Sequence, residues 1–153
     1  MKVLVADDEP LAARRLIMEL SRRGDTEVVG PYSHGAAARA GIIETRPDVA
    51  LLDIQMPNST GFDALEGLLP EQLPLVIFTT AFPRYAVAAF QSGAIDYLLK
   101  PIDTEALDAA LEKARIRLQE KSAELRTHEL RALLAQMRSD ADRKTDYETF
   151  FWV

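Results

Sequence analysis

The sequence predicts an α/β protein with a doubly wound, five-stranded parallel sheet and an extended C-terminal helix. Short apolar runs alternate with helical patterns five times before Thr104, which is typical of a parallel sheet covered by helices on both faces. The run Val49–Leu52 contains no polar residue, as expected of a strand buried on both sides. Polar side chains follow these runs at their carboxyl ends, where such sheets place their ligands.

The five strands are expected where short runs of apolar and β-branched residues stand between helical patterns or turn-forming residues. The run Val49–Leu52 is apolar throughout, so we expect that strand to be buried on both faces. The expected strands are Val3–Ala6, Glu27–Pro31, Asp48–Asp53, Leu75–Thr79 and Ile95–Leu99.

Proline and glycine set the limits of the expected helices. Pro10 suits the first turn of a helix, and Gly24 is a good signal for its end. Pro47 stops an Ala-rich helix, Gly93 ends a later one, and Thr104 is a suitable N-cap for the last. The expected helices are residues 10–23, 34–45, 61–68 and 84–91, and one that begins at residue 104.

The C-terminal segment has the pattern of one long helix. It contains neither glycine nor proline, so residues 104–139 are expected to form one helix. Leu111, Leu118 and Leu125 recur every seven residues, which resembles a coiled-coil seam that two polar residues interrupt. A dimerising or connecting helix is favoured, and a solvated tail helix is the alternative.

These patterns divide the chain into three parts. Residues 1–118 form the expected globular domain, and residues 119–142 form a helical linker that could be a coiled coil. Residues 143–153 include the aromatic, strand-like stretch YETFFWV. They are expected to be the start of a truncated effector domain or a tail.

Composition excludes several classes of function. The chain has no cysteine, which excludes disulfides, thiolate catalysis and cysteine-ligated zinc, and its two histidines make no metal pair. The net charge of −6 argues against general affinity for nucleic acid. No apolar run approaches the ~20 residues of a membrane span, and the N-terminal run is too short for a signal peptide. We therefore expect a cytoplasmic protein.

Polar side chains at four strand ends are the candidate functional residues: Asp7 and Asp8, Asp53, Thr80, and Lys100. The carboxyl ends of parallel strands meet at one edge of a sheet, so these groups are expected to lie together. Carboxylates ~4 Å apart repel by roughly 4 kcal/mol at an effective dielectric constant of about 20, so the cluster must hold a proton or a cation. Oxygen ligands favour Mg²⁺, and the ammonium and hydroxyl groups suit a phosphoryl group carried on a carboxylate.

Four stretches resemble the receiver domains of bacterial two-component response regulators. They are VLVADDEP, LLDIQMPNSTG, VIFTTA and AIDYLLKP, and the resemblance covers about residues 1–115. It implies the flavodoxin-like or CheY-like strand order 2-1-3-4-5. It also implies that Asp53 is the phosphoacceptor. Asp8 and Asp53 would bind Mg²⁺ together with the backbone carbonyl of Gln55, and Asp7 would help through a water molecule.

The resemblance also implies how the phosphoryl group is held and sensed. Thr80 and Lys100 would hold its oxygens, and the Lys100–Pro101 peptide bond would be cis. We expect Thr80 to move toward the phosphoryl group, which makes room for Tyr97 to turn inward as a switch. The neighbouring aromatic residues Tyr85 and Phe90 are expected mainly to pack.

The stretch FTTAFPRYAVAAFQSGAIDYLLKPID is most similar to receivers of the LytTR (LytR/AlgR) type, although Pro83 replaces a residue that is polar in many of them. This type usually controls a DNA-binding effector domain, so DNA would be bound only outside these residues. The implied partners are a sensor histidine kinase or phosphotransfer protein, and a second copy of the chain. The copies would meet through residues 84–91, residues 95–99 and the last helix, or through the C-terminal helix. The alternative is a stand-alone phosphorelay or protein-interaction module.

Three other classes of protein fit less well. A haloacid-dehalogenase-type phosphatase needs a second aspartate two positions after the first, where this chain has Gln55. A flavodoxin-like electron carrier needs a phosphate loop after the first strand, where Asp7-Asp8-Glu9 would repel the phosphate of FMN. A receiver used only as an unphosphorylated scaffold would not need the complete set of site residues. We therefore expect a phosphoacceptor that catalyses its own phosphorylation and dephosphorylation, and not an enzyme acting on a separate substrate.

Overall fold

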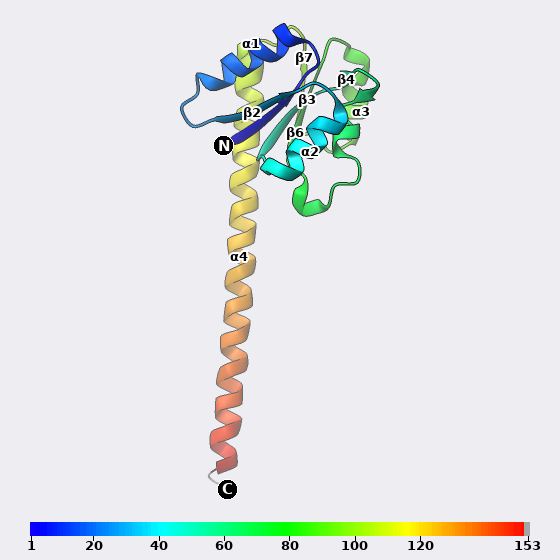
Figure 1. Ribbon diagram of the computed structural model, residues 1–153. Coiled ribbons are helices and arrows are strands. Elements are labelled where there is room, and N and C mark those ends of the chain that lie inside the picture. The colour runs from blue at the N-terminus through cyan, green and yellow to red at the C-terminus, as the bar shows by residue number, and fades with distance from the viewer. Residues whose placement is uncertain (152–153) are drawn as a thin grey trace. The chain divides into compact units, whose positions relative to one another are not determined.

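The computed structural model describes the backbone of residues 1–151 and the side chains of residues 1–142. A five-stranded sheet, in which all neighbouring strands are parallel, forms its centre (Figure 1). The strand order is β2-β1-β3-β6-β7, which is the predicted order 2-1-3-4-5 when these strands are counted along the chain. The strands are β1 (Lys2–Ala6), β2 (Glu27–Tyr32), β3 (Val49–Asp53), β6 (Leu75–Thr80) and β7 (Asp96–Leu99).

Helices cover both faces of this sheet, so the predicted fold class is confirmed (Figure 1). Alternate strand residues point to opposite faces, and β3 shows this clearly because all five of its residues are buried. Leu52 lies in a core cluster with Ile42 of α2 and Ala89 of α3. The helices are α1 (Pro10–Ser21), α2 (Gly35–Thr45), α3 (Ala86–Gln91) and α4 (Thr104–Phe151).

The helix predicted at residues 61–68 is wrong beyond a single turn, because the structure has only short 3-10 helices between β3 and β6. Gly67 has a φ of +74° and Pro70 has no amide hydrogen, so this segment cannot continue as an α-helix. A small antiparallel hairpin, which the sequence did not reveal, precedes the first 3-10 helix. These elements are β4 (Gln55–Met56), β5 (Ser59–Thr60), η1 (Asp63–Leu65) and η2 (Pro70–Gln72).

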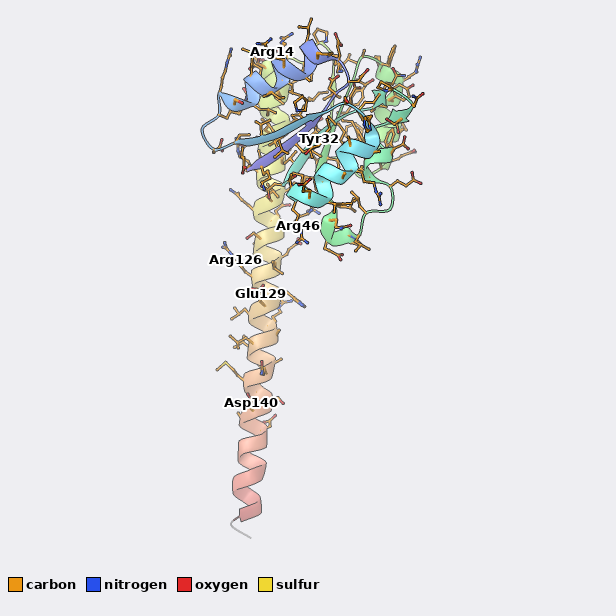
Figure 2. All side chains as sticks on the ribbon, viewed as in Figure 1. Arg14, Tyr32, Arg46, Arg126, Glu129 and Asp140 are labelled. Atoms are coloured by element: carbon orange, nitrogen blue, oxygen red, sulfur yellow. The ribbon has the colours of Figure 1, made fainter. Side chains whose placement is uncertain are left out.

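Helix α4 begins at Thr104, as predicted. The chain consists of two compact units, residues 1–115 and 116–153, and the first turns of α4 belong to the first of them. These turns bury Leu107, Leu111 and Ala114 in the first unit. The predicted coiled-coil seam is therefore wrong at its beginning, because Leu111 packs into the core of that unit and cannot also face a partner helix. In the second unit, the side chains of residues 119–142 are all exposed, including Arg126, Glu129 and Asp140 (Figure 2).

The strand-like interpretation of the stretch from Tyr147 is wrong as far as Phe151, where the backbone is still helical. A lone strand leaves its backbone groups unpaired, whereas a helix satisfies them within one segment. Trp152 and Val153 lie outside the described residues. Among the residues that the structure describes, no helix is both long enough and apolar enough to cross a membrane.

Candidate functional site

The predicted site residues lie at the carboxyl ends of four adjacent strands. Asp7 follows β1, Asp53 ends β3, Thr80 ends β6 and Lys100 follows β7. The parallel register brings these ends level, since Asp53 pairs with Thr79 and Thr80 pairs with Leu99. Residues far apart in the sequence are therefore gathered at one edge of the sheet, as the strand pattern predicted.

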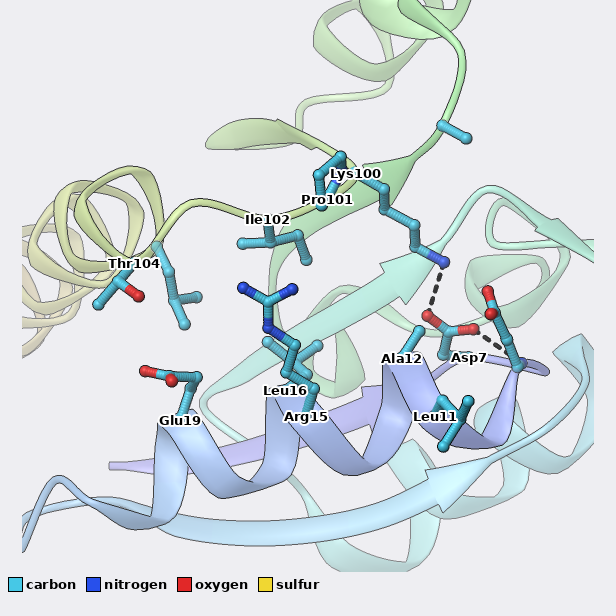
Figure 3. A pocket seen from close by; sticks show the side chains of 13 residues that line it. Asp7, Leu11, Ala12, Arg15, Leu16, Glu19, Lys100, Pro101, Ile102 and Thr104 are labelled. Carbon is cyan, nitrogen blue, oxygen red and sulfur yellow. Dashed lines mark hydrogen bonds and ion pairs between the residues drawn. The ribbon is translucent and has the colours of Figure 1, made fainter.

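Lys100 joins two of the carboxylates. Its Nζ lies 2.7 Å from Oδ2 of Asp7 and 2.8 Å from Oδ2 of Asp53, and Figure 3 shows it reaching toward Asp7. Both aspartates are almost completely buried, with exposed fractions of 4% for Asp7 and 5% for Asp53. A buried carboxylate is costly unless it is paired, and the shared ammonium provides that pairing.

Three carboxylates come close enough together to hold a cation. One oxygen from each of Asp7, Asp8 and Asp53 lies within 4.8 Å of the others, and Asp8 is the exposed member of the group. Three hard oxygen donors at a site that solvent can reach suit Mg²⁺, because this ion keeps several water ligands and uses few protein carboxylates. One ammonium cannot balance three negative charges, so the donor set fits a bound divalent ion.

Burial and pairing shift the pKa values of the central pair. Burial raises the pKa of the Asp53 carboxyl, the Lys100 ammonium opposes this, and the negative charge of Asp7 adds to it, so the net shift is upward. For Lys100, burial lowers the pKa, but hydrogen bonds to Asp53 and Asp7 outweigh that effect and raise it. Lys100 is therefore a persistent cation at neutral pH.

Backbone amides fix the remaining oxygens of the two buried aspartates. The Glu9 N–H donates to Oδ1 of Asp7 at 2.9 Å, and the Gln55 N–H donates to Oδ1 of Asp53 at 3.1 Å. Each carboxylate is thus held by an amide two residues later and by the same lysine. The two side chains are therefore already oriented without a ligand, which lowers the cost of binding a cation there.

Gly61 lies close to the backbone of Asp53, the last residue of β3. A Cβ atom at this position would lie 2.6 Å from the carbonyl oxygen of Asp53, which real Cβ atoms do not do. We expect Gly61→Ala to lower the free energy of unfolding by about 1–3 kcal/mol, because the backbone must shift to admit the methyl group. Urea denaturation measures this change.

The matched control for that substitution is Gly24→Ala. Nothing lies within 4 Å of a Cβ atom at Gly24, so the change there is expected to be within about 0.5 kcal/mol. Equal stability of the two variants would contradict the close approach of Gly61 to Asp53.

Thr80 and Tyr97 are linked through the backbone of Phe82. Thr80 is buried, and its Oγ1 accepts a hydrogen bond from the Phe82 N–H at 3.1 Å. The Tyr97 hydroxyl donates to the Phe82 carbonyl at 2.7 Å, and its ring packs against the core cluster. Burial raises the pKa of Tyr97, so its hydroxyl remains a donor. The sequence had not singled out Phe82, and no pattern around it could have revealed this link.

Two hollows adjoin the central pair. A cavity of about 470 Å³ lies between α1 and the residues that follow β7, and its lining includes Leu11, Arg15 and Ile102 (Figure 3). The second, which we term the acceptor cleft, has a volume of about 620 Å³. Its lining includes Asp8, Asp53, Gln55, Thr80, Phe82 and Lys100. The Lys100–Pro101 peptide bond beside it is cis, the geometry that the resemblance implied.

The fold and the site together define a receiver-type α/β domain. Residues 3–112 match the response regulator receiver domain family, so the chain belongs to that family and is the receiver domain of a two-component response regulator. Receiver domains bind Mg²⁺ at an acidic pocket and interact with histidine kinases and phosphotransfer partners.

Individual relatives agree with this assignment. The transcriptional regulatory protein BtsR of Escherichia coli strain K12 is 45% identical over 121 residues, which are 79% of this chain and 49% of that protein. The chain thus spans about half the length of the curated relatives that it matches. The response regulatory domain of mrkE from Klebsiella pneumoniae has a TM-score of 0.69 and 28% identity, covering 78% of this chain and 99% of that one. The response regulator domain of Thermotoga maritima CheB has a TM-score of 0.63 and 32% identity, covering 75% and 93%.

Proposed function

We propose that Asp53 of this receiver accepts a phosphoryl group from a phosphohistidine of a sensor kinase or phosphotransfer protein. The observation that supports this best is the Lys100 ammonium bridging Asp53 and Asp7, with Asp8 close to both. Negative oxygens gather around a carboxylate that accepts a phosphoryl group, so cationic groups must surround it. Asp53 has Lys100 as one such neighbour, and the paired aspartates beside it suit a second cation.

The transfer follows from these positions. A carboxylate oxygen of Asp53 attacks phosphorus, the bond from phosphorus to the imidazole nitrogen breaks, and that nitrogen keeps the electron pair. Lys100 releases its hold on Oδ2 of Asp53 and binds an oxygen of the transferred group, and the Thr80 hydroxyl donates to another. The Gln55 N–H continues to hold Oδ1 of Asp53, which keeps the carboxylate oriented.

Four residues would hold Mg²⁺ in this scheme: Asp8, Asp53, Gln55 through its backbone carbonyl, and Asp7 through a water molecule. Bound there, the ion supplies positive charge to the phosphoryl oxygens. The chain itself acts as a phosphoacceptor that promotes its own phosphorylation and dephosphorylation, rather than as an enzyme with a separate substrate.

The phosphoryl group would be sensed through Thr80. When its hydroxyl turns toward the phosphoryl oxygens, the hydrogen bond from the Phe82 N–H is lost. Phe82 is also bound by Tyr97, so the change reaches β7, and Tyr97 then moves further inward. The surface around Phe82 and Tyr97 would thus have two alternative packings. The negative charge of the phosphoryl group would select between them, which makes this surface a switch.

The output would be transcriptional. The BtsR relatives are named as transcriptional regulatory proteins, and the chain spans about half their length, which supports a transcriptional effector domain outside these residues. The sequence resemblance makes the LytTR type our proposal for that domain. The switch would control dimerisation through α3, β7 and α4, or through the second unit of α4. DNA would be bound by the effector alone, in the cytoplasm. A stand-alone phosphorelay module is the alternative, and DNA binding by the longer protein would distinguish the two.

Labelling with acetyl phosphate tests the phosphoacceptor proposal. The purified chain is incubated with this donor and Mg²⁺, and its intact mass is expected to increase by one phosphoryl group. The same reaction with EDTA is expected to leave the protein unlabelled, because the carboxylates then lack the cation that suits them. Unchanged mass under both conditions would refute the proposal, and equal labelling under both would refute the role of the metal.

A further inference from the structure

A second connection leaves the acceptor cleft besides the one through Thr80. The Gln55 side chain donates from Nε2 to the hydroxyl oxygen of Tyr85 at 2.9 Å, while the Gln55 N–H donates to Asp53. Gln55 lines the cleft, whereas Tyr85 is not one of its lining residues and belongs to the 3-10 helix η3 (Pro83–Tyr85) that precedes α3. One residue thus contacts the acceptor with its backbone and η3 with its side chain.

Tyr85 is itself firmly held. Its ring packs against the core cluster and lies 6.3 Å from the Phe82 ring in an edge-on arrangement. The Arg84 guanidinium lies 4.7 Å from the centre of the Phe82 ring and 5.1 Å from that of Tyr85, which are favourable cation–π distances. An exposed glutamine normally samples many rotamers, so a fixed hydroxyl partner restricts Gln55 to one position at the cleft.

We propose that Tyr85 is a positioning residue that holds the Gln55 side chain in the lining of the acceptor cleft and thereby lengthens the lifetime of the phosphoryl group on Asp53. This inference rests on the proposed function. Hydrolysis requires a water oxygen to attack phosphorus while the bond from phosphorus to the Asp53 oxygen breaks. The products are inorganic phosphate, which takes up the oxygen and one proton of that water, and the free carboxylate, with the second proton passing to solvent. A side chain held in one position in the lining of the cleft reduces the access of water to phosphorus.

The contact between Gln55 and Tyr85 uses different atoms from the proposed switch through Thr80, Phe82 and Tyr97. Thr80 and Tyr97 act on the backbone of Phe82, whereas Gln55 and Tyr85 meet through their side chains. A variant that removes only the Tyr85 hydroxyl therefore leaves both Phe82 hydrogen bonds possible. The lifetime of the phosphoryl group and the ability to accept it are then separable properties.

A double-mutant cycle tests the inference. Wild type, Tyr85→Phe, Gln55→Ala and the double variant are labelled with acetyl phosphate and Mg²⁺, the donor is removed, and the loss of label is followed. Tyr85→Phe is expected to shorten the half-life by about two- to tenfold, the range that corresponds to one net hydrogen bond. The double variant is expected to be no shorter-lived than the shorter-lived single variant, because both remove the same contact.

Tyr32→Phe is the matched control. Tyr32 is a half-buried tyrosine at the end of β2 (Figure 2). Its ring packs close to Gly41 of α2. Its variant is expected to keep the half-life of wild type. If Tyr85→Phe had the half-life of wild type, the inference about Tyr85 would be overturned. The same would follow if the fold-changes in half-life of the two single variants multiplied in the double variant. Neither result would affect the proposed function. Failure of wild type to accept any label would overturn the proposed function together with this inference.

Discussion

Replacing Asp53 with asparagine is expected to abolish phosphoryl labelling while leaving the domain folded. An amide is not a nucleophile that can form an acyl phosphate, yet asparagine has nearly the shape of aspartate. Its amide oxygen can still accept a hydrogen bond from Lys100 or from the Gln55 N–H, and Lys100 keeps its ion pair with Asp7. Intact-mass measurement after incubation with acetyl phosphate and Mg²⁺ reads the label, and circular dichroism reads the fold.

Asp103→Asn provides the matched control for the acceptor substitution. Asp103 is exposed and lies just before α4, outside the acceptor cleft, so the same chemical change there is expected to leave labelling at the level of wild type. If the Asp53→Asn protein were labelled as fully as wild type, another residue would carry the phosphoryl group. The strand-end cluster would then need a different explanation.

The position of the site could be predicted because it follows from topology. A parallel sheet aligns the carboxyl ends of its strands, so residues as far apart as Asp7 and Lys100 were expected to meet, and the ion pair between them is 2.7 Å long. The contact between Gln55 and Tyr85 follows no such rule. It depends on the turn of η3 and on a side-chain rotamer, and neither leaves a pattern in the sequence.

Two of the errors in the predicted fold have identifiable physical causes. Residues 61–68 were expected to be helical, but Gly67 adopts a positive φ and only one turn forms. Leu111 was assigned to a coiled-coil seam because the spacing that faces a partner helix also faces a sheet. Periodicity identifies the apolar face of a helix, and only the packed structure shows what that face covers.

Replacing Lys100 with methionine is expected to have the second largest effect, and it changes function and stability together. Labelling is expected to fall by about a hundredfold or more, since the group that neutralises the phosphoryl oxygens is lost. The free energy of unfolding is expected to fall by about 3 kcal/mol, because Asp7 and Asp53 remain buried without their shared cation. Mg²⁺ is expected to restore more stability to this variant than to wild type, because no ammonium then competes for those carboxylates.

Lys113→Met is the comparison that isolates the effect of burial. The Lys113 ammonium also meets a carboxylate, that of Asp96 at 3.1 Å, but 58% of the lysine side chain is exposed. Losing this surface pair is expected to cost no more than about 1 kcal/mol and to leave labelling unchanged. Urea titrations of both variants, with and without Mg²⁺, measure the difference. Equal losses from the two substitutions would mean that Lys100 is one more surface charge, and the account of Asp53 as an acceptor held by a buried cation would fail.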